Sequence, residues 1–171
     1  MRYQDQLERV RRYHKRFADF NSGIEDWIET DNYMDDVYAF FQNCYHLKDW
    51  LKKDPAFKAP EDIEKFVEKT LCLALCADIC NATKHLGLDT RKKGKGPRSG
   101  HESKVAKREY KVGFGAEGDS MSCQVTVEHN GKNVDAYTLA TECLKEWEEF
   151  VKRACGPCGC VSECEPRTRH P

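Results

Sequence analysis

Four side chains suited to acid–base and phosphate chemistry lie within eight residues, at the end of an apolar stretch. Residues 80–86 read CNATKHL and follow a run that is apolar apart from one carboxylate. Histidine exchanges protons near neutral pH, and a lysine ammonium stabilises a phosphate or a developing negative charge. The sequence therefore offers a candidate catalytic group, which consists of Asp78, Asn81, Lys84 and His85.

Two interpretations of this group stay open. In the first, it forms a polar cleft at the end of a helical bundle, with His85 as acid or base and Lys84 as phosphate stabiliser. In the second, it is a polar helix end whose side chains satisfy backbone groups and a neighbouring helix. Asp78 is costly to bury unless it is paired, and Lys84 and His85 are near enough in sequence to be its partners.

A second candidate pair lies in residues 45–50, which read YHLKDW. His46 and Asp49 are three residues apart, a spacing at which side chains touch on a helix. In the functional interpretation, Asp49 orients His46 in a cleft or a dimer interface. In the alternative, the pair lies on an exposed helix face and contributes little.

Positive charge is concentrated in one segment of a chain whose net charge is −1. The 21 residues from Arg91 to Lys111 hold nine Lys or Arg and only two Glu. This asymmetry predicts either a polyanion-binding loop or a solvated flexible one. Because no aromatic side chain precedes Tyr110 there, the loop favours phosphate attraction without base stacking. The candidate nucleic-acid-binding residues are Arg91, Lys92, Lys93, Lys95 and Arg98.

Apolar periodicity predicts four helices, over about 3–20, 33–53, 60–86 and 137–153. Alternation predicts strands over 105–114, 122–128 and 132–136, with Asn130-Gly131 as a hairpin turn. We therefore expect an α+β, mainly α fold: a four-helix up-down bundle with a small three-stranded antiparallel sheet inserted between the third and fourth helices. Residues 1–154 form this domain, including the basic loop 90–103, and residues 155–171 form a Cys-rich disordered tail.

The ten cysteines are expected to be thiols, because the N-terminus has no apolar signal region and the chain is expected to be cytoplasmic. Cys72, Cys76 and Cys80 form a row at four-residue spacing and are predicted to be small buried hydrophobes, with a metal site as the less favoured alternative. The tail cysteines, namely Cys155, Cys158, Cys160 and Cys164, leave a metal-binding regulator as a further alternative. No small-molecule cofactor and no membrane partner is expected, and no metal is assigned to the candidate site residues.

The segments AFFQNCYHLKDWLKKD and ADICNATKHLGL resemble a group of small bacterial and phage proteins whose helical part is similar to the HEPN superfamily of four-helix bundles. The resemblance covers the second and third helices and, more loosely, residues 1–154. It implies homodimers and, for many members, metal-independent RNase activity in toxin, defence or mobile-element settings. In that case His85 assists attack by a ribose 2′-hydroxyl, while Lys84 and Asn81 stabilise the phosphate.

The chain departs from the catalytic signature of this superfamily, an Arg followed four to six residues later by His. Arg9 and His14 have the spacing, but His14 belongs to an apolar stripe and Arg9 points away from it. Lys84 can replace an Arg as a cation but not as a bidentate fork. RNA binding or cleavage is therefore the leading hypothesis, and a non-catalytic protein-interaction module of the same fold is the alternative.

Overall fold

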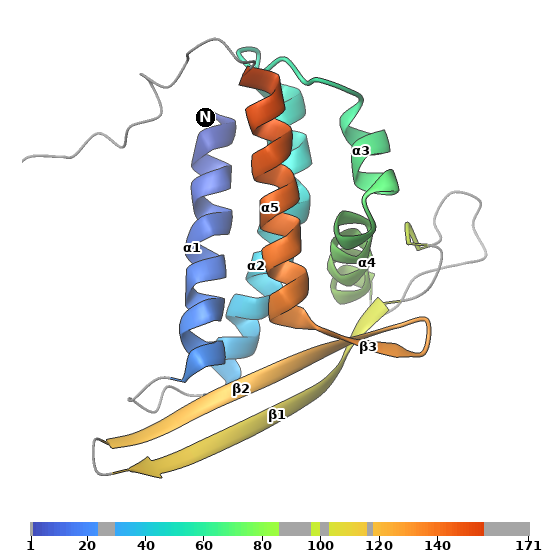
Figure 1. Ribbon diagram of the computed structural model, residues 1–171. Coiled ribbons are helices and arrows are strands. Elements are labelled where there is room, and N and C mark those ends of the chain that lie inside the picture. Colours follow the sequence, from blue (N-terminus) through green and yellow to red (C-terminus); the bar gives the residue numbers. More distant parts are fainter. Residues whose placement is uncertain (1, 24–29, 86–96, 100–102, 116–117, 156–171) are drawn as a thin grey trace, which may run out of the picture.

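The computed structural model describes residues 2–23, 30–85, 97–99, 103–115 and 118–155. In these residues the fold is mainly helical with one small antiparallel sheet (Figure 1). No helix in this part of the chain combines the length and the apolar character needed to span a bilayer. The elements are α1 (Tyr3–Ser22), α2 (Thr30–Lys53), α3 (Ile63–Lys69), α4 (Leu71–His85), β1 (Ser103–Gly115), β2 (Gly118–His129), β3 (Lys132–Asp135) and α5 (Ala136–Cys155).

The predicted third helix is divided in two, so the prediction of one continuous helix over 60–86 is wrong. Thr70 has extended backbone angles and separates α3 from α4. The first piece begins later than expected, because the Asp62 carboxylate accepts the Lys65 N–H at 2.9 Å and caps the helix there. The break lies where the polar face of α3 gives way to residues that are apolar all round, and it lets α4 take a new direction.

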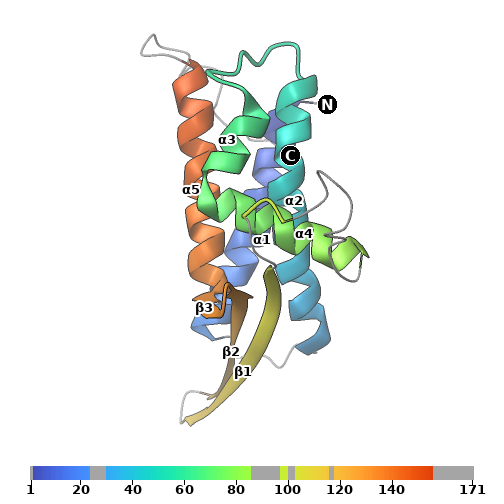
Figure 2. The same ribbon diagram turned by 90° about the vertical axis from the view of Figure 1, so that its right-hand side faces the viewer.

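Helices α1, α2 and α5 lie side by side, whereas α4 runs across α2 (Figure 2). Helix α4 packs against α2, α3, α5 and β1. Nine consecutive residues of it, 72–80, are buried. The core between the helices is filled by large aromatic and aliphatic side chains, including Phe17, Phe40, Leu47, Trp147 and Phe150.

The sheet has the order β1-β2-β3, with both pairs antiparallel. Alternate residues of β2 are buried, because successive side chains of a strand point to opposite faces; these residues are Cys123, Val125 and Val127. Strand β2 packs against α1 and α5, and β1 packs against α4. The β2–β3 turn has positive φ at Asn130 (50°) and Gly131 (70°), as the predicted tight hairpin requires.

The structure confirms a mainly helical α+β fold with a small three-stranded antiparallel sheet inserted before the last helix. The described residues contain five helices, and a four-helix up-down bundle stays a prediction. Cys155, the first residue of the predicted tail, is the last residue of α5. The rest of that tail and most of the predicted basic loop lie outside the described residues.

Candidate functional site

The buried Asp78 carboxylate of α4 holds the chain at Arg98 and Ser99, within the basic segment 91–111. Asp78 is fully buried, and its two oxygens accept the backbone N–H of Arg98 at 2.6 Å and of Ser99 at 3.0 Å. The Ser99 hydroxyl donates a third hydrogen bond to it at 2.5 Å. The partners of Asp78 that the structure describes are therefore two backbone amides and one hydroxyl, 20 and 21 residues away. The side chains of Lys84 and His85, the partners that the sequence suggested, lie outside the described residues.

The other members of the candidate catalytic group lie in the last turns of the same helix. Asn81 is half-buried, and α4 continues to His85. His85 follows Asp78 by seven residues, which is about two turns or 10 Å along the axis. The side chains of Lys84 and His85 lie outside the described residues, and so do Arg91, Lys92, Lys93 and Lys95.

The Arg98 side chain joins a cluster of charges on α2 and α3. Its guanidinium contacts the Glu64 carboxylate at 2.8 Å and Glu68 at 3.9 Å. Lys48 contacts Glu64 at 2.9 Å, and Lys52 also binds this carboxylate. Burial would raise the pKa of Glu64, but the hydrogen bonds from Lys52, Lys48 and Arg98 outweigh it and lower that pKa to about 2.

Tyr45 lies beneath two of these cations. The Lys48 ammonium is 4.8 Å from the centre of its ring, and the Arg98 guanidinium is 5.6 Å from it. Both distances are within cation–π range. The predicted nucleic-acid-binding residue Arg98 is therefore already paired with a carboxylate and stacked on an aromatic ring, so a phosphate would compete with Glu64 for it.

The second predicted pair is not joined by any hydrogen bond that the structure describes. His46 is exposed, and its ring lies 6.1 Å from that of Tyr45. Asp49 contacts the Lys48 ammonium at 3.3 Å. The two residues share the outer side of α2, but Asp49 neutralises a cation rather than orienting His46.

Arg9 and His14, which have the spacing of the HEPN signature, contact different helices. Arg9 donates to Gln6 at 2.9 Å and lies 5.8 Å from the Trp50 ring of α2. His14 is within hydrogen-bond distance of the Thr141 hydroxyl of α5, 2.9 Å away. Burial lowers the pKa of His14, although Glu148 and Cys44 oppose that shift. The pair does not converge on one site.

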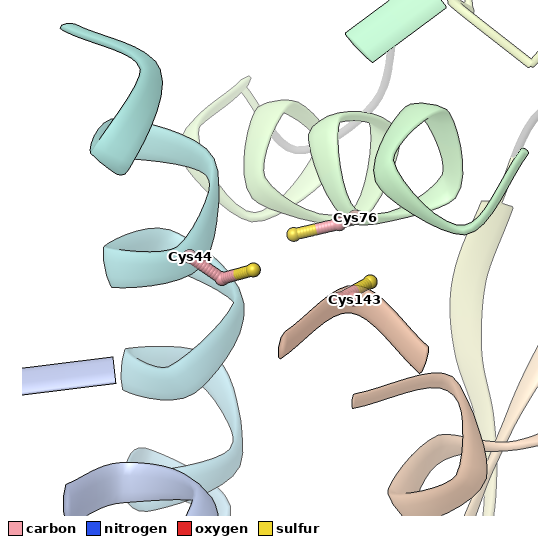
Figure 3. A group of neighbouring side chains, drawn as sticks. All are labelled: Cys44, Cys76 and Cys143. Atoms are coloured by element: carbon pink, nitrogen blue, oxygen red, sulfur yellow. The ribbon is translucent and has the colours of Figure 1, made fainter. Parts of the chain in front are cut away.

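A group of side chains that the sequence did not single out lies in the core between three helices. The sulfur atoms of Cys44 (α2), Cys76 (α4) and Cys143 (α5) all lie within 4.8 Å of one another (Figure 3). All three residues are fully buried. The Cys76 thiol donates to the Phe41 carbonyl at 3.3 Å, and the Cys143 thiol donates to the Cys72 carbonyl at 3.2 Å.

The three thiols differ in acidity. Burial raises the pKa of Cys76 and of Cys143 well above the ordinary range of a thiol. Burial acts on Cys44 in the same direction, but its polar neighbours Cys143, Cys76 and Trp147 outweigh it, so the pKa of Cys44 is lowered.

The structure confirms that the row formed by Cys72, Cys76 and Cys80 is buried. Only Cys76 of this row belongs to the three-thiol group. The sequence held one signal of the group, since Cys44 and Cys143 each occupy a core position in the apolar stripe of a helix. Whether these two cysteines meet Cys76 depends on the direction of α4. The sequence prediction did not show that direction, because it treated α3 and α4 as one helix.

Replacing Asp78 with Ala is expected to reduce the free energy of unfolding by roughly 2–3 kcal/mol, because the amides of Arg98 and Ser99 lose a charged acceptor. Urea denaturation measures this loss, and hydrogen exchange should accelerate at those two amides. The control is Asp35→Ala, at an exposed position of α2, with an expected change within ~0.5 kcal/mol. Unchanged exchange at residues 98 and 99 in the Asp78 variant would contradict the anchoring role.

Glu64→Gln is expected to destabilise the protein by about 1 kcal/mol at pH 7, since partial exposure screens the three ion pairs. The folded-state pKa of about 2 lies below the value near 4.3 of an unfolded glutamate. The stabilisation by Glu64 is therefore complete above the unfolded pKa and disappears as the pH falls from about 4.3 towards 2. Denaturation at pH 7 and pH 2.5 tests this, with the exposed Glu142→Gln as control. A difference independent of pH would refute it.

No protein family, curated protein or solved structure matches this chain. Its function is therefore inferred from the chemistry of the residues described above and from the resemblance in sequence.

Proposed function

We propose that this protein is a HEPN-like RNA-binding protein that holds the phosphate backbone beside the last turns of α4. The anchoring of the basic segment by Asp78 carries this proposal. It brings together two features that the sequence predicted separately, namely the polar end of α4 and the run of cations that ends at Arg98.

The order of residues along the chain links the cations of the basic segment to helix α4. Lys95 precedes Arg98 by three residues, and Gly94 separates it from Arg91, Lys92 and Lys93. Because the backbone of Arg98 is bound to the buried Asp78, these cations are tethered to the helix that also carries His85. A phosphate attracted by them would lie near the candidate catalytic residues.

The cations of the described charge cluster contribute less to the expected RNA affinity. Lys48, Lys52 and Arg98 are neutralised by Glu64, Asp49 and Glu68. The basic segment 91–111, in contrast, holds nine Lys or Arg and only two Glu. Phosphate affinity depends on cations that release counterions, so the segment and not the cluster should determine the salt dependence.

We further propose that the protein cleaves the RNA that it binds. In a metal-independent RNase, a base removes the proton of the ribose 2′-hydroxyl, and the oxygen attacks the adjacent phosphorus. His85 is the proposed base, with Lys84 and Asn81 stabilising the charge on the phosphate. The four-helix bundle architecture and a homodimer belong to the same HEPN-like proposal.

One observation favours a non-catalytic interaction module as the second candidate. Asp78 accepts hydrogen bonds from Arg98 and Ser99, and the Arg98 guanidinium is paired with Glu64. Two of the predicted site residues thus have structural partners. In this alternative, the polar end of α4 is structural and the basic segment binds an acidic protein.

RNA binding is tested by replacing Lys92, Lys93 and Lys95 together with Gln. With a mixed-sequence single-stranded RNA, the slope of log affinity against log salt should fall by about 2, at ~0.7 per lost phosphate contact. The control replaces Lys15, Lys58 and Lys132 with Gln, which removes the same charge from exposed positions elsewhere. Fluorescence anisotropy at several salt concentrations measures both. Equal weakening in the two variants, or no binding by the unaltered protein, would overturn the proposal.

Cleavage is tested with the same RNA in the presence of a metal chelator. His85→Ala should slow cleavage at least ~100-fold, the lower limit for loss of a general base, while the exposed His46→Ala should not. A substrate with 2′-deoxyribose throughout should stay intact. RNA that is bound but left intact by the unaltered protein would exclude the nuclease reaction and leave binding alone.

A further inference from the structure

We propose that Cys44, Cys76 and Cys143 form a buried binding site for one soft, thiophilic metal ion, best matched by Cu(I). Figure 3 shows the three side chains grouped between α2, α4 and α5, and their sulfur atoms all lie within 4.8 Å of one another. This site is separate from the RNA-binding region, because Cys76 and Asp78 are about 200° apart around the α4 axis.

The spacing of the sulfur atoms fits a single ion. All three lie within 4.8 Å of one another. A metal–sulfur bond of about 2.3 Å places the sulfur atoms of one site roughly 3.8–4.0 Å apart. Each sulfur therefore needs to move by less than ~1 Å to reach coordination distance, which a rotation about the Cα–Cβ bond can supply. Backbone rearrangement of the three helices is not needed.

The donor set selects the kind of metal. Three thiols and no oxygen or nitrogen donor make up the group that the structure describes. Soft sulfur ligands favour Cu(I) and Zn(II) over Mg²⁺ or Ca²⁺. A structural zinc ion takes four ligands, and a fully buried site gives water little access as the fourth. Cu(I) is stable with three sulfur ligands in a plane, so it matches the site better than zinc.

A second observation points to the same place. The Trp147 indole nitrogen is fully buried and makes no hydrogen bond in the described part of the chain. It nevertheless lies close enough to Cys44 to act on that thiol. A buried N–H without an acceptor is costly. A metal-bound Cys44 sulfur carries more negative charge than a thiol and would provide the acceptor.

Protons balance in the binding step without any redox change. Each thiol that coordinates as a thiolate releases its proton to solvent. The carbonyls of Phe41 and Cys72 would lose the thiol hydrogen bonds that they now accept. Both lie inside helices, where the backbone N–H four residues later still donates to them. Loss of the two thiol protons therefore leaves no buried carbonyl without a partner.

The burial of the site determines how it is loaded. The group is enclosed by three helices, so an ion enters most readily before these helices have packed. Since the ion would join α2, α4 and α5, it should bind the folded chain and not the unfolded one. Metal binding of this kind raises the melting temperature.

The test uses the full-length chain with Cys155, Cys158, Cys160 and Cys164 replaced by Ser, so that these cysteines do not bind the probe. The protein is refolded under anaerobic reducing conditions with Cu(I) and a competing Cu(I) chelator. We expect one Cu(I) per chain, a higher melting temperature and, by X-ray absorption, a copper ion bound by three sulfur atoms. A chain without tightly bound copper, or copper with nitrogen or oxygen ligands, would overturn the proposal. So would tighter binding of Zn(II) than of Cu(I).

Matched variants identify the ligands. Cys44→Ala, Cys76→Ala and Cys143→Ala should each weaken Cu(I) affinity by at least ~100-fold, more than loss of a second-shell partner. The controls, Cys72→Ala, Cys80→Ala and Cys123→Ala, remove buried thiols outside the group and should bind Cu(I) normally. Trp147→Phe should weaken the affinity by about 10–100-fold. Circular dichroism confirms folding of each variant. If a variant does not fold, the number of sulfur ligands that X-ray absorption gives for the protein with all its core cysteines decides the question. Equal losses in the two sets of cysteine variants would reject the assignment.

Discussion

Burial of α4 on nearly all sides is the constraint on which the rest of the structure depends. Residues 72–80 are buried without interruption, so the helix must be covered by α2, α3, α5 and β1 together. Such a helix has no face to present to water, and it therefore crosses the other helices instead of lying in line with α3. Its one internal charge, Asp78, is tolerated because the chain returns and supplies two backbone amides and a hydroxyl.

The same enclosure produces two chemically different sides of α4. On the side of Asp78, the partners are polar and lead to the charge cluster of Arg98 and Glu64 near the surface. On the side of Cys76, the neighbours are the thiols of two other helices, and all three cysteines are fully buried. The small side chains of Ala74 and Ala77, also buried, leave room for helices to approach. The proposed RNA region and the proposed metal site thus share one helix without sharing a residue.

The sequence predicted the helices and the hairpin turn, because these depend mainly on residues that are close together in the chain. The apolar stripes gave the correct places for α1, α2 and α5, and Asn130-Gly131 indicated the hairpin because both positions need positive φ. The break at Thr70 was missed because a helical pattern continues on both sides of it. The partners of Asp78 and the meeting of three cysteines depend on how distant segments pack. Periodicity within a single helix carries no information about that packing.

The covering of α4 by α5 has a consequence for the order in which the chain can fold. Helix α5 is the last element along the described chain, and it packs against both α1 and α4. Until it has been synthesised, the part of α4 that packs against α5 has no cover, although α2 and α3 are already present. Contacts between segments so far apart in sequence form late, and an uncovered apolar helix tends to associate with other chains. The nascent protein therefore depends on rapid docking of α5, or on a chaperone, to protect its most apolar helix.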